Sequence, residues 1–121
     1  MSAAEEQKAG ISLLPKRERI TSRDRIKAIL RIKQVHITTP LLNIVAEVNH
    51  GSFPRWVVIC TKRVGNAVQR NRIRRLFISA IARIRHKINK NIDIIVFPKV
   101  FNRKLGVDQV ETALEANIVK L

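Results

Sequence analysis

Residues 56–77 read WVVICTKRVGNAVQRNRIRRLF and form the pattern that decides the fold. The apolar run at residues 56–61 is typical of a central β-strand. The Gly65-Asn66 pair follows this run and marks a turn, and Asn66 is a residue type that caps helices. Residues 67–87 then repeat apolar side chains at the i, i+3, i+4 and i+7 spacing of an amphipathic helix. The stretch therefore predicts a strand, a tight turn and a long helix.

The polar half of this helix is almost wholly cationic. At about 100° per residue, Arg72, Arg75 and Arg83 fall opposite the apolar side. Arg74 and Arg85 fall at one flank. Guanidinium groups match the geometry of phosphate oxygens and can stack on bases. The pattern indicates a helix with one face on a sheet and the other on a polyanion.

The charge of the whole chain supports a polyanionic partner. The 121 residues include 24 Lys and Arg against nine Asp and Glu, a formal net charge of +15. No acidic residue occurs between Glu47 and Asp93, an interval whose basic residues run from Arg55 to Lys90. Because a merely solvated surface usually mixes both signs, we interpret the block as a nucleic-acid-binding face, with an anionic membrane surface as the weaker alternative.

The start of the long helix combines several groups that bind phosphate. The first turn of a helix leaves backbone N–H groups unpaired and carries a partial positive charge. Asn71 adds a donor and an acceptor for a base edge or a ribose hydroxyl. The candidate phosphate-binding side chains are Lys62, Arg63, Arg70, Arg72, Arg74 and Arg75.

The remaining elements complete one small domain. Residues 20–30 predict a first helix, with Thr21 or Ser22 as its cap. Further strands and a last helix are expected at residues 35–39, 41–48, 92–97 and 107–121. The order α-β-β-β-α-β-α predicts a single α/β domain, an α+β sandwich with helices packed on a four-stranded sheet. The last helix has an acidic side, with Asp108, Glu111 and Glu115, which makes it a poor RNA contact.

Residues 61–76, TKRVGNAVQRNRIRRL, resemble the signature of the bacterial ribonuclease P protein family. Leu14-Pro15-Lys16, followed by Arg19-Ile20, resembles the family's opening, so the likeness covers about residues 14–119. The resemblance implies the protein subunit of a ribonucleoprotein that removes the 5′ leader of precursor tRNA. It also implies a rare left-handed crossover from the strand before the basic helix to the strand after it.

The resemblance implies two RNA surfaces and a division of labour. The basic helix would meet the catalytic RNA, and a cleft between the first helix and the sheet would receive the single-stranded leader. The RNA-binding residues that the resemblance implies are Arg70, Asn71, Arg72, Arg74 and Arg75, flanked by Lys62, Arg63 and Asn66. The RNA would supply the active site and hold the catalytic Mg²⁺, so the protein alone would not be catalytic. Ile26 and Leu30 stand at cleft positions where the family has aromatic residues, and either residue could equally be core. Ile78 stands where the family usually has another arginine.

The other residue types give no sign of catalysis by the protein. Metal-dependent phosphodiester cleavage needs paired carboxylates, and Asp24, Glu47 and Asp93 are scattered in the sequence. The histidines likewise show no metal-ligand or acid–base spacing and are expected to be surface or structural residues: His36, His50 and His86. We expect Cys60 to be a small buried hydrophobe. Trp56 is left open between core and cleft wall.

Location, domain bounds and alternatives complete the expectations. The first ten residues, MSAAEEQKAG, lack the apolar stretch of a signal peptide, so we expect a cytoplasmic protein without a membrane or DNA partner. Residues 1–13 are expected to be a flexible tail and residues 14–121 the RNA-binding domain. A structural RNA binder such as a ribosomal protein is the main alternative. A helix-turn-helix DNA regulator fits less well, because a strand precedes the basic helix.

Overall fold

The computed structural model of the chain describes residues 14–100 and 102–121, so the predicted tail at residues 1–13 lies outside the described residues. These residues form the predicted order α-β-β-β-α-β-α. The helices are α2 (Arg23–Ile32), α3 (Ala67–Ile84) and α4 (Val107–Ile118). The strands are β1 (Val35–Thr38), β2 (Leu42–Val48), β3 (Arg55–Val58) and β4 (Ile92–Pro98). Short 3-10 segments are η1 (Lys16–Glu18), η2 (Lys62–Val64) and η3 (Arg85–Lys87). None of the described helices is long and apolar enough to span a bilayer.

The four strands form one mixed sheet in the order β1-β2-β4-β3. β2 pairs antiparallel with both β1 and β4, whereas β3 pairs parallel with β4 and places Trp56 opposite Ile94. α3 therefore connects two adjacent parallel strands, as a crossover must. The left-handed sense of this connection, which the family resemblance implies, stays a prediction.

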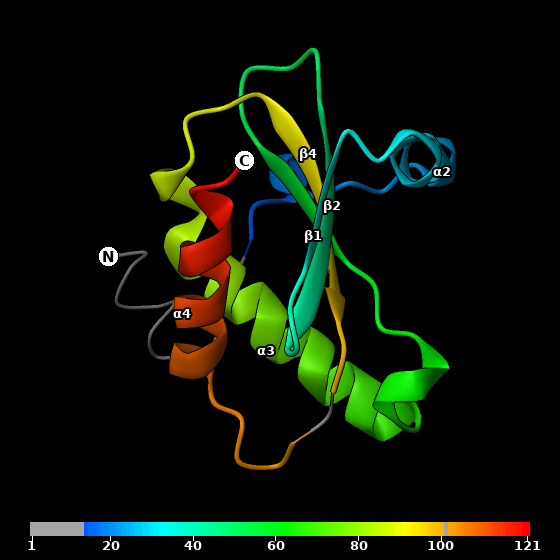
Figure 1. Ribbon diagram of the computed structural model, residues 1–121, viewed down its shortest axis with the longest axis vertical. Coiled ribbons are helices and arrows are strands. Elements are labelled where there is room, and N and C mark those ends of the chain that lie inside the picture. The colour runs from blue at the N-terminus through cyan, green and yellow to red at the C-terminus, as the bar shows by residue number, and fades with distance from the viewer. Residues whose placement is uncertain (1–13, 101) are drawn as a thin grey trace.

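Helices cover both faces of the sheet. In Figure 1, α3 and α4 lie on one side of the strands and α2 lies on the other. The α3 and α4 side holds the main core, in which Phe77 and Ile94 are fully buried. The α2 side holds a smaller cluster around Ile29, Val45 and Ile95. Because side chains alternate along a strand, β2 and β4 supply residues to both clusters.

Element ends differ from the sequence expectation by a few residues. Ser22, not Thr21, caps α2, because its hydroxyl accepts a hydrogen bond from the Arg25 N–H at 3.2 Å. The strand expected at residues 56–61 ends at Val58, after which the chain turns into η2. The helix expected to reach residue 87 ends as α-helix at Ile84 and continues as η3.

Trp56 belongs to the core, which answers the question that the sequence left open. It is 1% exposed, and its carbonyl accepts a hydrogen bond from the Ile20 N–H at 2.9 Å. Arg19 forms an isolated parallel bridge with Trp56, so the segment before α2 lies along the outer edge of β3. Leu14 packs into the main core from the same segment. This arrangement covers an edge strand that would otherwise be open to pairing.

A buried carboxylate on the central strand β4 ties four elements together. Asp93 is 0% exposed, and each of its oxygens accepts two hydrogen bonds. Oδ1 accepts from Arg55 Nε at 2.8 Å and from Asn49 Nδ2 at 2.9 Å. Oδ2 accepts from Arg55 Nη2 at 2.6 Å and from Arg25 Nε at 2.7 Å. Arg25 also binds Glu47, the cross-strand partner of Asp93, so α2 is joined to β2, β3 and β4.

This network gives stability that depends on pH. Burial alone would raise the pKa of Asp93, but the hydrogen bonds from Arg55, Arg25 and Asn49 outweigh burial and lower the pKa below its usual value. The folded-state pKa is therefore lower than the unfolded one. The stabilisation is fully present above the ordinary aspartate pKa of about 3.9 and is lost as the pH falls through the folded-state pKa.

We predict that Asp93→Asn lowers the free energy of unfolding at pH 7 by about 3–5 kcal/mol, because at this fully buried position the amide removes the counter-charge of Arg25 and Arg55 and turns a hydrogen-bond donor towards their own donors. The difference from the parent should shrink as the pH falls below about 4. Urea denaturation at several pH values measures both effects. Asp108→Asn is the control, since the Asp108 side chain is 91% exposed and should contribute little. Equal losses in the two variants would contradict the prediction.

Candidate RNA-binding surface

α3 begins with a closed capping box at the predicted cap, Asn66. Asn66 Oδ1 accepts a hydrogen bond from the Gln69 N–H, and Gln69 Oε1 accepts one from the Asn66 N–H, both at 2.9 Å. Gly65, just before the cap, has a φ of 152°, which side-chain-bearing residues rarely adopt. A Cβ at this position would also overlap the Gln69 side chain. The first turn, with its positive dipole end, is thus fixed by local chemistry that the sequence encodes.

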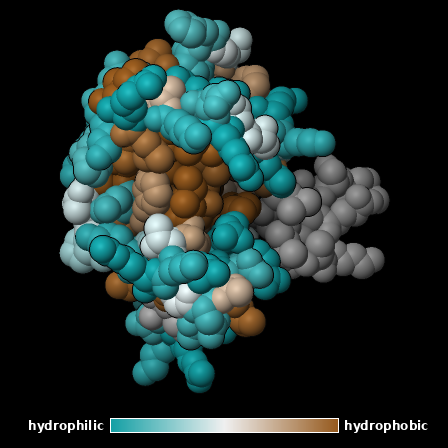
Figure 2. Space-filling view, turned by 90° about the vertical axis from the view of Figure 1, so that its right-hand side faces the viewer, coloured by the Kyte–Doolittle hydropathy of each residue, from teal (hydrophilic) through white to brown (hydrophobic). Residues whose placement is uncertain are grey.

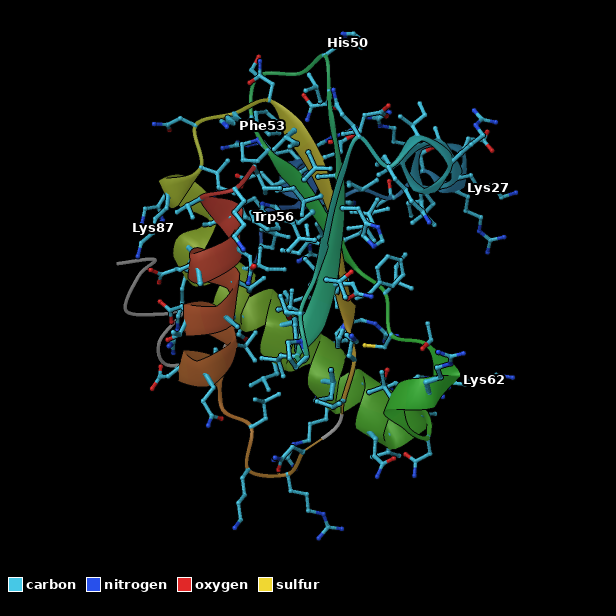
Figure 3. The ribbon with its side chains drawn as sticks, viewed as in Figure 1. Lys27, His50, Phe53, Trp56, Lys62 and Lys87 are labelled. Carbon is cyan, nitrogen blue, oxygen red and sulfur yellow. The ribbon has the colours of Figure 1, made fainter. Side chains whose placement is uncertain are left out.

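Exposed cations surround this helix start. Lys62 and Arg63 are exposed on η2, and Arg72 and Arg75 are exposed on α3. Figure 3 shows Lys62 projecting into solvent beside the first turns of α3. None of these four side chains forms an ion pair with another residue in the part of the chain that the structure describes. Their charges are therefore available to a ligand.

Arg70 and Arg74 are half-buried and make contacts that fix their position. Arg70 Nη1 donates to the Gly65 carbonyl at 2.7 Å, and Arg74 Nη1 donates to Asn71 Oδ1 at 2.8 Å. Burial raises the pKa of the Cys60 thiol, and the nearby charges of Arg74 and Arg70 oppose that effect. Cys60 is itself half-buried against the main core, which is less burial than the sequence led us to expect. The two arginines therefore form the inner flank of the surface.

The C-terminal half of the basic helix is neutralised within the protein. Arg83 Nη1 lies 3.2 Å from Asp108 and 3.4 Å from Glu111, so the acidic side of α4 contacts α3. The other ion pairs in this region are Arg85–Glu18 and Lys87–Glu115. The interpretation of the whole acid-free block as one binding face is therefore corrected, because carboxylates distant in sequence pair with Arg83, Arg85 and Lys87 of that block. Among the described residues, the cations of η2 and of the N-terminal half of α3 form no ion pair.

A groove of about 480 Å³ adjoins the exposed cations. Its lining residues come from β2, η2, its preceding turn and the end of β4: Asn43, Thr61, Lys62, Arg63, Phe97, Pro98 and Lys99. Phe97 is the only aromatic side chain among them and is half-buried. Asn43 Oδ1 is buried without a hydrogen-bond partner among the described residues. The groove therefore offers cations and one aromatic ring to a ligand.

Phe97, Asn43 and Lys99 were missed by the sequence reasoning. Phe97 and Asn43 lie directly opposite each other in the β2–β4 register, although 54 residues separate them in the chain. The signal that could have found Phe97 is the two-residue alternation of β4, which places residues 95 and 97 on the same face. The pairing of β2 with β4, however, is not encoded in either strand alone.

Ile26 and Leu30 lie on the α2 side of the sheet, half-buried against the smaller cluster. Phe97, Ile59 and Val57 pack against the same cluster. Figure 2 shows this side of the molecule, where an apolar area lies between rims of hydrophilic side chains. Neither Ile26 nor Leu30 lines the groove described above. Their role in a leader cleft stays a prediction.

Two of the acidic side chains lie closer together than their scattered positions in the sequence suggest, whereas the histidines lie at the surface as expected. Glu47 and Asp93, which are far apart in the chain, are cross-strand partners, but both carboxylates form ion pairs with arginines. The three histidines are exposed: His36, His50 and His86. Within residues 14–100 and 102–121, no group of three or more His, Cys, Asp or Glu side chains is arranged to hold a metal ion.

Comparison with known proteins gives one consistent picture. The Ribonuclease P family matches residues 14–121, whereas no curated protein sequence matches the chain. The RNase P protein from Thermotoga maritima superposes with a TM-score of 0.74 at 18% identity, over 86% of this chain and 97% of that one. The Staphylococcus aureus RNase P protein superposes with a TM-score of 0.70 at 23% identity, over 85% and 94%. A mutant of that S. aureus protein with defective mRNA degradation activity gives 0.72 at 21%, over 98% and 94%. At these identities the superpositions establish the fold.

We predict that Gly65→Ala destabilises the protein by about 1–3 kcal/mol, the cost of a side chain in a sparsely allowed backbone region. The same change should weaken RNA binding, because the new Cβ displaces Gln69 from the capping box. Thermal unfolding and RNA titration measure the two effects. Gly106→Ala is the matched control, because Gly106 also caps a helix but has open space around it and an ordinary φ of −109°. A harmless Gly65→Ala would show that the box does not require glycine.

Proposed function

Because the chain belongs to the ribonuclease P protein family and is the protein subunit of that ribonucleoprotein, we propose that two adjoining surfaces of the protein bind RNA. The open half of α3, with η2, binds the catalytic RNA through phosphate contacts. The adjoining groove binds the 5′ leader of precursor tRNA. The RNA carries out the cleavage, and the protein assists by increasing substrate affinity and shielding phosphate charge. A ribosomal-protein-like role lacks support, since the family match covers residues 14–121.

The uneven pairing of cations is the observation that carries this proposal. Carboxylates of α4 and η1 neutralise the end of α3 and η3, whereas the helix start keeps its charges unpaired among the described residues. A protein that used these cations only for solubility would gain nothing from pairing them at one end of α3 and leaving them unpaired at the other. Phosphate binding does gain, because each cation that replaces a condensed counterion on RNA contributes to affinity.

The chemistry of the surface supports catalysis by the RNA. Guanidinium and ammonium groups repel a divalent cation, so we place the catalytic Mg²⁺ on the RNA subunit. The same groups lower the repulsion between the phosphates of the catalytic RNA and those of the substrate. The protein then acts on binding and on the active RNA conformation, and supports metal binding indirectly. Among the described residues, this surface holds no pair of side chains arranged for general acid–base catalysis.

The groove suits a short single-stranded RNA segment. Phe97 offers a face on which one base can stack, an interaction worth about 1–3 kcal/mol per base. Lys62, Arg63 and Lys99 line the groove and can contact the leader backbone. With Ile26 and Leu30 in place of aromatics, leader binding here depends on a single ring and on charge.

We predict that replacing both Arg72 and Arg75 with alanine reduces the salt dependence of binding to ribonuclease P RNA. Each lost phosphate contact should lower the slope of log K against log salt by about 0.7–0.9. Cleavage of precursor tRNA by the reconstituted holoenzyme at low Mg²⁺ should fall in parallel. Filter binding across a salt series and leader-release assays provide the two measurements.

Arg83→Ala is the control for this prediction, because it removes one arginine charge from the same helix, and its effect is compared with that expected for each of Arg72 and Arg75. Arg83 already forms ion pairs with two carboxylates of α4. Its loss should therefore leave the slope of log K against log salt unchanged. Equal effects of Arg83 and of the Arg72 and Arg75 pair would show that the open half of α3 is not a distinct phosphate-binding surface. A folded protein that binds the RNA without stimulating cleavage would contradict the proposed assistance.

Phe97→Leu should weaken holoenzyme binding of precursor tRNA by about 5- to 150-fold, the loss of one stacked base. Leucine keeps apolar volume against the α2 cluster, so the fold should survive. Binding of mature tRNA, which has no leader, should not change. Phe97→Trp should retain affinity because it keeps an aromatic face. A uniform loss for both RNAs would place the effect outside the leader groove.

A further inference from the structure

A second cationic pocket lies at the other end of the sheet from the groove. It encloses about 570 Å³ and is lined by η1, α2, β3 and the loop between β2 and β3. Arg17, Arg25 and Arg55 line it together with His50 and Ser52, and no acidic side chain does. In Figure 3, His50 and Phe53 of this loop lie at the top of the molecule, far along its longest axis from Lys62. Neither the family signature nor the groove includes this pocket.

The buried Asp93 network leaves donors free on the pocket wall. Arg55 uses Nε and one Nη2 hydrogen on Asp93, so both Nη1 hydrogens and one Nη2 hydrogen are uncommitted by the described contacts. Arg25 uses Nε, Nη1 and Nη2 on Asp93, Glu47 and the Val48 carbonyl, which leaves one hydrogen on each terminal nitrogen. The carboxylate thus holds two guanidinium groups rigid while their outer edges face the pocket.

Arg17 adds a third guanidinium group to the pocket wall. Its guanidinium lies over the Phe53 ring, 5.8 Å from the centroid, and forms no ion pair among the described residues. Three arginines face two carboxylates here, Asp93 and Glu47, so the local formal charge is +1. Asp93 is fully buried and the Glu47 side chain is 15% exposed, so the acids lie behind the guanidinium groups. The accessible surface is therefore cationic.

We propose that this pocket binds a phosphodiester group of RNA, as a second anchor distinct from the start of α3. Pre-organised guanidinium edges match the paired oxygens of a phosphate. The Ser52 hydroxyl and the His50 ring add polar groups at the rim. A divalent metal would be repelled by the three arginines, and the small apolar contribution of Phe53 is already covered by Arg17.

Strand β4 joins the two sites. Asp93, which organises the pocket, and Pro98, which lines the groove, are five residues apart on this strand. At about 3.3 Å per residue, this separation is about 17 Å, so one phosphate cannot reach both sites. The phosphodiester in the pocket belongs either to the catalytic RNA or to a more distant part of the leader. Both sources present the same chemistry, and the experiment below separates them.

The test uses Arg17→Ala in the full chain, with Lys120→Ala as a matched loss of one exposed cation on the C-terminal end. Binding to ribonuclease P RNA alone is measured between 50 mM and 200 mM salt. Loss of one phosphate contact lowers the slope by about 0.7–0.9, so the defect at 50 mM should exceed that at 200 mM by about threefold. Precursor tRNAs with short and long leaders are then titrated into the reconstituted holoenzyme. Circular dichroism and the urea midpoint check that the variants are folded.

A changed slope with the RNA alone assigns the phosphate to the catalytic RNA. An effect on substrate affinity that appears only with the long leader assigns it to the leader. Ser52→Asp, which adds a negative charge while keeping Arg17 on Phe53, should reproduce either defect, whereas Ala116→Asp on α4 should not. Parent-like behaviour of Arg17→Ala and Ser52→Asp, or equal effects of Arg17→Ala and Lys120→Ala, would overturn the second anchor. If the Arg72 and Arg75 variant is also parent-like, the proposed function fails instead.

Discussion

The compensation of one buried charge governs the arrangement of this protein. Asp93 lies on the central strand β4, where an ionised carboxylate is tolerated only with full hydrogen bonding. Arg25 and Arg55 supply most of those bonds and come from α2 and β3. The Arg25 contact adds to the apolar packing that holds α2 on the sheet, and the same network holds the β2–β3 loop through Asn49 and places two arginines on the wall of the second cationic pocket.

Ion pairing elsewhere decides where the excess charge is displayed. With 24 basic and nine acidic residues, most cations cannot be paired. Among the described residues, the acids that form ion pairs lie against the end of α3, against η3 and in the Asp93 network. The start of α3 and η2 are left open as a consequence. The carboxylates therefore limit the proposed RNA-binding surface, because they pair with the cations at the other end of α3.

The part of the candidate site at the start of α3 was predictable because its residues are contiguous in the sequence. Asn66 caps α3 as the sequence indicates, and Arg72 and Arg75 are exposed as the helical periodicity predicts. Arg83, in contrast, had the same periodicity but is bound by residues of α4. Phe97 had no distinctive sequence context, and only its pairing opposite Asn43 places it in the groove. Periodicity reports which side of a helix is polar, but it does not report what lies next to that side.

The sequence by itself determined the order of elements, the helix start at Asn66 and the family, because these depend on propensities and spacings within short segments. The tertiary structure alone decided which cations are open, which strands are neighbours and where pockets form. Those properties depend on contacts between residues far apart in the chain, such as Arg25 with Asp93 across 68 positions. Such a contact gains its energy from burial and geometry, and neither is present in the isolated segments.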